Sequence, residues 1–385
     1  MTVYLDHNAT TPVRPEVVDA MLPFLRENFG NPSSIYSLGQ RARKAVEQAR
    51  AQVAALLGAD ESEIVFTSGG SEADVLGVSG AAWQAFEESK GARNQIVSSP
   101  IEHDAIRLKL TSLKRRGFDI QFCRVDRNGM IDLESIKALI GPKTAVVAVM
   151  LANNEVGTIQ PIAEVAALAK DHGAIVMTDA VQAAGKLPID VKALGVDLLA
   201  ISGHKLNAPK GVGALYVRKG IRLSQVVTGH QEKNRRGGTE NVAGIVALGV
   251  ACELARKDLA KTSSYLALRR KLEQGVLAIA GSRLNGHPEK RIPSVAHFSF
   301  EGVDGHQLVV ALDLDGICVS AGPACSSGAS MASHVLTAMG CEESLATGSI
   351  RVSMGWGTTE RDVDRLLEVL PKAVEKLRRV HAASL

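Results

Sequence analysis

Hydrophobic and polar positions follow two different periods in the first two thirds of the chain. Apolar side chains recur every three or four positions from 37 to 57 and Gly58 follows, which predicts a helix ended by a glycine. Short β-branched runs, typical of buried strands, occupy 63–66, 144–149, 174–177 and 196–201. Helical stretches lie between most of these runs. The pattern therefore predicts an α/β fold with a mainly parallel central sheet flanked by helices.

The pattern changes after about Gly249. A charged helix is predicted over 256–277, mixed strand signals follow, and a last amphipathic helix covers 360–380 with Pro371 inside it. We therefore expect a large domain over 15–255 and a smaller α+β domain made of 1–14 and 256–385. No apolar run approaches the roughly 18 to 20 residues of a membrane span, so we expect none.

Composition excludes several classes of protein. The 385 residues carry a net charge of only +3, which argues against a nucleic-acid surface. The N-terminus has neither the charged start nor the apolar stretch of a signal peptide. The five cysteines form no CxxC pair, so neither a disulfide scaffold nor a zinc module is expected. We expect a cytoplasmic protein with no metal site and no direct contact with membrane or nucleic acid.

The residues that follow the predicted strands are the first place to look for a ligand, because open α/β sheets bind ligands beyond the carboxyl ends of their strands. The first strand leads into Thr67-Ser-Gly-Gly-Ser-Glu72, which suits either a phosphate or a plain helix cap. The third ends at Asp179, whose carboxylate needs a positive partner or caps a helix. The fourth is followed by Lys205, either a Schiff-base amine or a surface lysine, and then by Lys210, which we expect to face solvent.

A phosphate cradle, a buried aspartate and a reactive lysine are together what pyridoxal 5′-phosphate requires of a protein. The aspartate keeps the pyridine nitrogen protonated, so that the ring can accept electrons. The lysine holds the aldehyde, exchanges with a substrate amine and transfers protons. The order of these pieces at successive strand ends indicates such a cofactor more strongly than any one of them does.

A thiol stands in the small-residue stretch SAGPACSSGAS, from Ser320 to Ser330. A lone cysteine is usually a packed hydrophobe, but this stretch has no apolar bulk to pack against. It is typical of an exposed loop, and Cys325 is therefore a candidate for chemistry. Cys123, Cys252 and Cys318 lie in apolar strand or helix patterns and are expected to pack. Cys341, just after Gly340, is the rival thiol.

Motifs along nearly the whole chain resemble those of the cysteine desulfurases of the NifS- and IscS-like group, which are class-V enzymes of fold type I among pyridoxal-phosphate proteins. One departure is Gly70-Ser71 where Ala-Thr is usual, and another is Pro323 in place of a serine. The matching stretches are Tyr4-Leu-Asp-His-Asn-Ala-Thr-Thr-Pro12, Gly30-Asn-Pro-Ser-Ser34, Phe66-Thr-Ser-Gly-Gly-Ser-Glu-Ala73, Glu102-His103, Asn153-Asn-Glu-Val-Gly157, Asp179-Ala-Val-Gln182, Ser202-Gly-His-Lys205, Arg236-Gly-Gly-Thr-Glu-Asn241, Ala324-Cys-Ser-Ser-Gly328, Ser333-His-Val-Leu336 and Ser349-Ile-Arg-Val352.

The resemblance implies a role for each matching residue. Lys205 would bind pyridoxal 5′-phosphate, Asp179 would pair with its ring nitrogen, and His103 would stack on the ring and transfer protons. Cys325 would be the nucleophile. The remaining implied contacts are Asn154 and Gln182 near the ring hydroxyl, Gly70, Ser71, Ser202 and His204 at the phosphate, Thr239 at the phosphate of the other subunit of a homodimer, and Arg351 with Asn8 or Asn154 at the substrate carboxylate.

The activity implied is conversion of L-cysteine to L-alanine, with the sulfur carried by Cys325 as a persulfide and passed to an acceptor such as an iron–sulfur scaffold protein. A selenocysteine lyase or an aminotransferase of the same fold is the nearest alternative. A non-catalytic docking protein that kept the fold is a third. The complete set of Lys205, Asp179, His103, Arg351 and Cys325 argues against that third interpretation.

Overall fold

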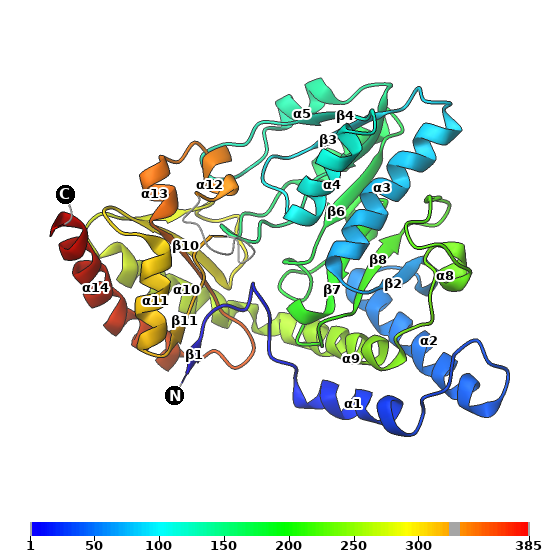
Figure 1. Cartoon of the computed structure of the whole chain (residues 1–385), viewed down its shortest axis with the longest axis horizontal. Helices are drawn as coiled ribbons and strands as arrows, with labels where there is room; N and C mark the ends of the chain where they lie inside the picture. The colour runs from blue at the N-terminus through cyan, green and yellow to red at the C-terminus, as the bar shows by residue number, and fades with distance from the viewer. Residues whose placement is uncertain (1, 323–331, 384–385) are drawn as a thin grey trace.

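The computed structural model describes residues 2–322 and 332–383, so Cys325 lies outside the described residues. Within them the largest sheet has seven strands in the order β2-β8-β7-β6-β5-β3-β4. Adjacent strands of this sheet are parallel, except that β8 is antiparallel to both β2 and β7. The predicted α/β sheet is confirmed (Figure 1). The strands are β2 (Ile64–Thr67), β3 (Gln95–Ser98), β4 (Asp119–Phe122), β5 (Thr144–Ala148), β6 (Ile175–Asp179), β7 (Leu198–Ser202) and β8 (Gly213–Val217).

Helix α2 (Ser37–Leu57) shows how the hydrophobic pattern determines an element. Its buried residues, among them Val46 and Val53, lie on one side of the helix and pack against α9 (Val242–Asp258). Gly58 ends it with a φ of 68°, a left-handed conformation that glycine adopts without steric penalty. The helix predicted over 37–57 is therefore confirmed at both ends.

Different helices cover the two faces of the large sheet, because side chains alternate along each strand. In β7, Leu199 and Ile201 belong to one hydrophobic cluster, and Leu198 and Ala200 belong to another on the opposite face. Burial on both faces explains why these strands read as continuous apolar runs. The first face carries α1 (Pro15–Arg26), α2, α5 (Leu133–Leu139), α6 (Ile162–Lys170), α7 (Val191–Leu194) and α9, and the second carries α3 (Gly70–Glu88) and α4 (Asp104–Lys114).

The C-terminal part of the chain builds a second, antiparallel sheet from β9 (Ser282–Asn285), β10 (Val295–Phe300) and β12 (Ser349–Ser353). A separate hydrophobic cluster joins it to the helices α10 (Thr262–Leu277), α11 (Gly305–Leu314) and α14 (Glu360–Ala383). The helix predicted from 256 to 277 is wrong at its start, because α9 continues to Asp258 and a 3-10 turn precedes Thr262. The hydroxyl of Thr262 donates to the carbonyl of Leu259 at 2.7 Å, a local bond that competes with regular helix.

The first residues of the chain join the C-terminal part. Strand β1 (Val3–Tyr4) pairs in parallel with β11 (Ile317–Cys318). The N–H groups of His7 and Asn8 then donate to the main-chain and side-chain oxygens of Ser353, at 3.1 and 2.9 Å. Farther on, the Thr11 hydroxyl donates to the His204 carbonyl at 2.9 Å. Residues 5–12, called the crossing segment below, therefore connect the second sheet to the carboxyl ends of β6 and β7.

Three short helices complete the described chain: α8 (Gln231–Asn234), α12 (His334–Ala338) and α13 (Glu343–Thr347). Among the helices of the described residues, none is both long enough and apolar enough to cross a membrane.

Candidate functional site

A cavity of about 490 Å³ opens where the ends of β6 and β7 face the crossing segment. It lies beyond the carboxyl ends of parallel strands, where the sequence predicts a ligand. Residues from both sheets line it, so it brings together side chains that are far apart in the chain. The predicted residues that line it are Asn8, Gly70, Ser71, His103, Asn154, Asp179, Gln182, Ser202, His204, Lys205 and Arg351.

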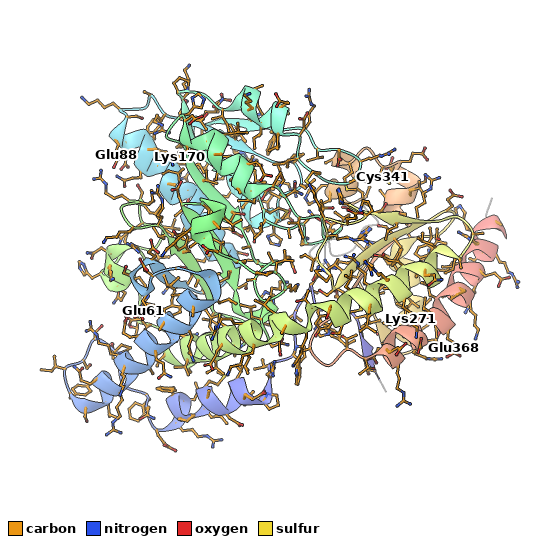
Figure 2. All side chains as sticks on the ribbon, turned by 180° about the vertical axis from the view of Figure 1, so that it is seen from behind. Glu61, Glu88, Lys170, Lys271, Cys341 and Glu368 are labelled. Carbon is orange, nitrogen blue, oxygen red and sulfur yellow. The ribbon has the colours of Figure 1, made fainter. Side chains whose placement is uncertain are left out.

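Two predicted residues are not placed in this cavity. Thr239 is exposed on the loop between α8 and α9 and does not line it. Cys325 lies outside the described residues. The rival thiol, Cys341, packs beside α12 and α13 and does not line the cavity either (Figure 2). Partial burial raises the pKa of the Cys341 thiol, which makes it a poorer nucleophile.

The glycine-rich turn before α3 forms one end of the cavity. A Cβ at Gly70 would lie 2.8 Å from Cγ2 of Val181 and 3.1 Å from Cβ of Ser202, so a side chain there would require these neighbours to shift. No side chain of the described residues caps α3, and its first N–H groups are left to meet a ligand. The positive end of the helix dipole and the hydroxyls of Ser71 and Ser202 make this end suitable for an anion.

Buried acids form another part of the wall. The Oδ1 atom of Asp179 accepts a hydrogen bond from the Val181 N–H at 2.8 Å, so this residue also supports the turn after β6. Burial raises the pKa of Asp179, while His103 and Lys205 act in the opposite direction. Burial and the charge of Asp179 raise the pKa of Asp74, and its buried Oδ1 atom has no partner among the described residues. Acids in this state favour a cationic group of a ligand.

Lys205 follows β7 in a 3-10 turn (Gly203–Lys205). Its Nζ atom donates to the main-chain oxygens of Asn8 and Ala9, at 2.5 and 2.6 Å. The crossing segment therefore holds the amine at the cavity wall, which rules out the alternative of a surface lysine. Lys210 is exposed, as expected, although it also lines the cavity.

Arg351 reaches the cavity from β12 and has 3% of its side chain exposed. One Nη atom donates to Asp6 Oδ1 at 2.7 Å and the other to the main-chain oxygen of Asn154 at 3.0 Å. Its buried Nε has no partner among the described residues, and neither has the buried Oδ1 of Asn154. A guanidinium held in this way retains a donor for a carboxylate ligand.

Three histidines line the cavity. The Nδ1 atom of His103 accepts a hydrogen bond from the Ala105 N–H at 3.1 Å, which caps α4 and leaves the proton of the neutral ring on Nε2. The Nε2 atom of His334 lies 3.0 Å from the Glu102 carbonyl, to which it donates. Burial and neighbouring lysines lower the pKa of His204 to about 4, so that its ring is neutral at pH 7.

Sequence reasoning missed three residues at or beside this cavity: Asp74, His334 and Lys186. Helical spacing from a predicted site residue could have identified two of them. Asp74 lies four positions after Gly70 on α3, and Lys186 lies four positions after Gln182, whose Oε1 accepts from its Nζ at 2.9 Å. His334 has no comparable local signal, because its place depends on how α12 packs against Glu102.

Comparisons with known proteins show the family to which the chain belongs. The aminotransferase class-V family profile matches residues 3–366. The cysteine desulfurase IscS of Methanosarcina thermophila is 46% identical over 378 residues, which cover 98% of this chain and 93% of that protein. A solved NifS-like protein superimposes with a TM-score of 0.89 at 36% identity, covering 99% of this chain and 100% of that one. SspA, solved in complex with cysteine, has a TM-score of 0.80 at 32% identity, covering 92% and 99%.

These matches extend over nearly the whole chain, and the cavity contains the residues that the motifs single out except Thr239 and Cys325. The chain belongs to the aminotransferase class-V family and, within it, to the cysteine desulfurases.

Proposed function

We propose that this protein is a pyridoxal-phosphate-dependent cysteine desulfurase that converts L-cysteine to L-alanine and transfers the sulfur to Cys325 as a persulfide. The observation that carries the proposal is the meeting of Lys205, Asp179 and Arg351 around one cavity, although they come from two sheets. The similarity to curated cysteine desulfurases over 98% of the chain supports the same reaction.

The residues present fit pyridoxal 5′-phosphate. When bound, this cofactor withdraws electrons from the α-carbon of an amino acid, which makes the α-proton acidic and weakens the C–S bond. Asp179 would hold the ring nitrogen, because a cation relieves the cost of its burial. His103 would cover the ring, and Gly70, Ser71 and Ser202 would hold the phosphate. Asn154, Gln182 and His204 complete the contacts from this chain, with Thr239 supplied by a second copy.

Arg351 would bind the substrate carboxylate through its unpartnered Nε, assisted by Asn8 or Asn154. That contact would place the substrate amine and α-proton toward Lys205, which lines the same cavity. A neutral Lys205 amine would then remove the α-proton. His103, with its proton on Nε2, would transfer protons to and from the thiol groups.

Sulfur transfer follows from the chemistry of Cys325. Its thiolate attacks the substrate sulfur, a new S–S bond forms, and the electron pair of the broken C–S bond stays on carbon. Protonation of that carbon gives alanine, and the persulfide remains on the chain. A second nucleophile must then take the outer sulfur, and we propose a sulfur-acceptor protein such as an iron–sulfur scaffold.

The protein would act as a cytoplasmic homodimer. Support for the dimer is the position of Thr239, which is exposed and outside the cavity of its own chain, where a second copy can use it. Support for a reducing compartment is that Cys123, Cys252, Cys318 and Cys341 are all free thiols. We further propose that 15–255 fold as the cofactor-binding domain and that 1–14 with 256–385 form the smaller one, each around its own core.

The deciding experiment compares alanine release from L-cysteine by the wild type and by Cys325→Ser, with a reductant present. Release should fall by at least about a hundredfold in the variant, which removes the nucleophile. Cys341→Ser is the matched control and should release alanine at the wild-type rate. Equal release by Cys325→Ser would contradict the assignment of the nucleophile. Exchange with a keto acid in place of sulfur release would favour an aminotransferase, and a strong preference for selenocysteine would favour the lyase.

A further inference from the structure

His334 lines the cofactor cavity, but the proposed reaction gives it no role. It is the first residue of α12, which lies where the C-terminal part of the molecule faces the large sheet (Figure 1). A histidine ring can take up a proton only at a nitrogen that has a free lone pair. Whether His334 can act on a substrate therefore depends on which of its two ring nitrogens is free.

One nitrogen of the His334 ring is bound to the wall of the cavity. The Nε2 atom lies 3.0 Å from the main-chain oxygen of Glu102, and a carbonyl oxygen can only accept, so the neutral ring carries its proton on Nε2. The Nδ1 atom keeps its lone pair and has no hydrogen-bond partner among the described residues. Glu102 is buried outside the cavity, whereas His334 lines it. Nδ1 is therefore the basic atom of this ring that is available to a ligand.

The other two histidines of the cavity offer no such atom. The Nδ1 atom of His103 accepts from the Ala105 N–H, so His103 can take up a proton only if it gives up the bond that caps α4. Burial, and then the charge of Lys205, lower the pKa of His204 to about 4, which makes its ring a weak base. Of the histidines in the described part of the cavity wall, His334 is thus the one that keeps a free and basic nitrogen.

The residues beside His334 hold its ring in place. The Ser333 hydroxyl donates to Glu155 Oε2 at 2.5 Å, and its oxygen accepts from the N–H groups of Val335 and Leu336 at 3.1 and 3.3 Å, which caps α12. The side chains of Val335 and Leu336 are buried. The start of α12 is therefore fixed on both sides of His334, as a residue that must meet a reacting atom requires.

Glu155 can stabilise a positive charge on this ring. Its side chain is buried, and its Oε1 atom has no partner among the described residues. Burial raises the pKa of Glu155, whereas the Ser333 hydrogen bond and the charges of His334 and Arg351 act in the opposite direction. Because this attraction is mutual, a Glu155 carboxylate favours the protonated form of His334 in return.

We propose that His334 is a further catalytic residue: its Nδ1 atom takes the proton of the substrate S–H group as the sulfur is transferred, and returns it to the carbon that the sulfur leaves. The inference rests on the proposed function, in which L-cysteine occupies this cavity. His103 would remain the partner of the second thiol, that of Cys325.

The step is balanced in atoms and electrons. The Cys325 thiolate forms the new S–S bond, the C–S bond breaks, and the electron pair of that bond stays on carbon. The proton passes from the substrate sulfur to His334 Nδ1 and then to this carbon, which becomes the methyl group of alanine. The persulfide remains as an anion, so a single negative charge is present before and after, and no oxidant, reductant or further acid is required.

The first test replaces His334 by glutamine, whose amide can keep the bond to the Glu102 carbonyl but cannot take up a proton. In the cofactor-loaded enzyme His334→Gln should lower kcat for alanine release at least about a hundredfold and leave KM for L-cysteine within about twofold. Exchange of the α-proton of L-alanine in heavy water, followed by NMR, should keep its wild-type rate. That exchange needs Lys205 but no transfer of sulfur.

A second measurement needs no activity. In the cofactor-free full chain, labelled at histidine with the heavy nitrogen isotope, the NMR shifts of the neutral His334 ring should show a proton on Nε2 and none on Nδ1. These signals are assigned by their absence from His334→Gln. His172→Gln, at an exposed histidine just after α6, is the matched control and should change neither kinetic readout. His334→Asn replaces His334→Gln if the latter does not fold, and should show the same loss of kcat.

Three outcomes would overturn the inference alone. One is a wild-type kcat in the His334 variant, and another is a proton on Nδ1 of the neutral ring. The third is α-proton exchange that falls as far as alanine release, because His334 would then act on the fold of the site and not on the sulfur step. A wild type that exchanges the α-proton but releases no alanine would contradict the proposed function, and the inference with it, so the two failures can be told apart.

Discussion

Two buried arginines, Arg50 and Arg351, each pair with a carboxylate and each line a cavity, yet they differ in how completely they are bound. In Arg50 every side-chain nitrogen has a partner: both Nη atoms bind Glu232 at 2.8 and 2.9 Å, one of them also binds the Ile64 carbonyl, and Nε reaches Glu47 at 3.3 Å. In Arg351 the Nε atom has no partner among the described residues.

The surroundings of Arg50 show what its ion pair stabilises. Glu232 also accepts a hydrogen bond from the Phe66 N–H at 2.9 Å, which ties it to β2. It begins a run of three non-glycine residues with positive φ, Glu232 at 48°, Lys233 at 58° and Asn234 at 61°. Such a turn costs of order 1–3 kcal/mol per residue and persists only when surrounding contacts hold it. The pair with Arg50 is one such contact, so we interpret Arg50 as structural.

The comparison teaches that burial and a carboxylate partner do not identify a ligand-binding arginine, because Arg50 has both. The informative difference is a buried donor left over at the cofactor cavity, as in Arg351; Arg291 also has an unpartnered Nε among the described residues, but it does not line that cavity. Substitutions at three positions can break or sharpen this distinction.

Replacing Arg50 by methionine should have the largest effect. It leaves the Glu232 carboxylate, 3% exposed, with only the Phe66 N–H as a donor among the contacts described above. Loss of one partner of a buried pair should lower the free energy of unfolding by about 3–5 kcal/mol, measured by urea denaturation. The kcat/KM per cofactor-loaded site should stay near the wild-type value. A stable but inactive variant would reverse our interpretation of Arg50.

Arg351→Met is the matched substitution on the other side of the comparison. Loss of a charged donor to the substrate carboxylate should lower kcat/KM for L-cysteine about a hundredfold, which corresponds to roughly 3 kcal/mol. The measurement is steady-state alanine release, with cofactor content determined by absorbance. Asp6 is partly exposed and can regain water, so the loss of stability should be smaller than for Arg50→Met. Wild-type kcat/KM in this variant would exclude Arg351 from substrate binding.

Asp6→Asn tests only how the Arg351 guanidinium is oriented, and it should have the smallest effect. It removes the charged partner at 2.7 Å from Arg351 but keeps an acceptor of the same shape. We expect KM for L-cysteine to rise about tenfold with kcat little changed, because a charge-assisted hydrogen bond becomes a neutral one. Serine at position 6 keeps no comparable acceptor and should raise KM further. If Asp6→Asn lowered kcat and left KM unchanged, Asp6 would act on the chemical step instead.

Much of the large sheet could be predicted because its signals are local. The helix over 37–57, the four strand runs and the residues that follow them depend on spacing within a few positions. The break at 259–261 could not be predicted, since the charged pattern continues across it and only the packing of α9 and α10 in different parts of the molecule requires it.

In the site, too, some residues could be predicted from the sequence and some contacts could not. Asp179 and Lys205 follow from their place at strand ends, and the resemblance supplies the distant Arg351. What neither supplies is the partner of each group: that Asp6 binds Arg351, that Asn8 joins two lysines, or that Asp74 shares a wall with Asp179. These contacts depend on where residues 5–12 pass between the two sheets, and no local pattern in that segment encodes its path.

The crossing segment has a consequence for how the protein folds during its synthesis. Asp6 is synthesised 345 residues before its partner Arg351, and Asn8 is synthesised 345 residues before its partner Ser353. The crossing segment can therefore bind residues of the large sheet, such as Asn154 and Gln182, before its partners on β12 have been made. A nascent chain can complete its large sheet before β12 is made, but Arg351 joins the cavity only afterwards. In the proposed reaction, a chain that stops before β12 therefore has no arginine with which to bind the substrate carboxylate.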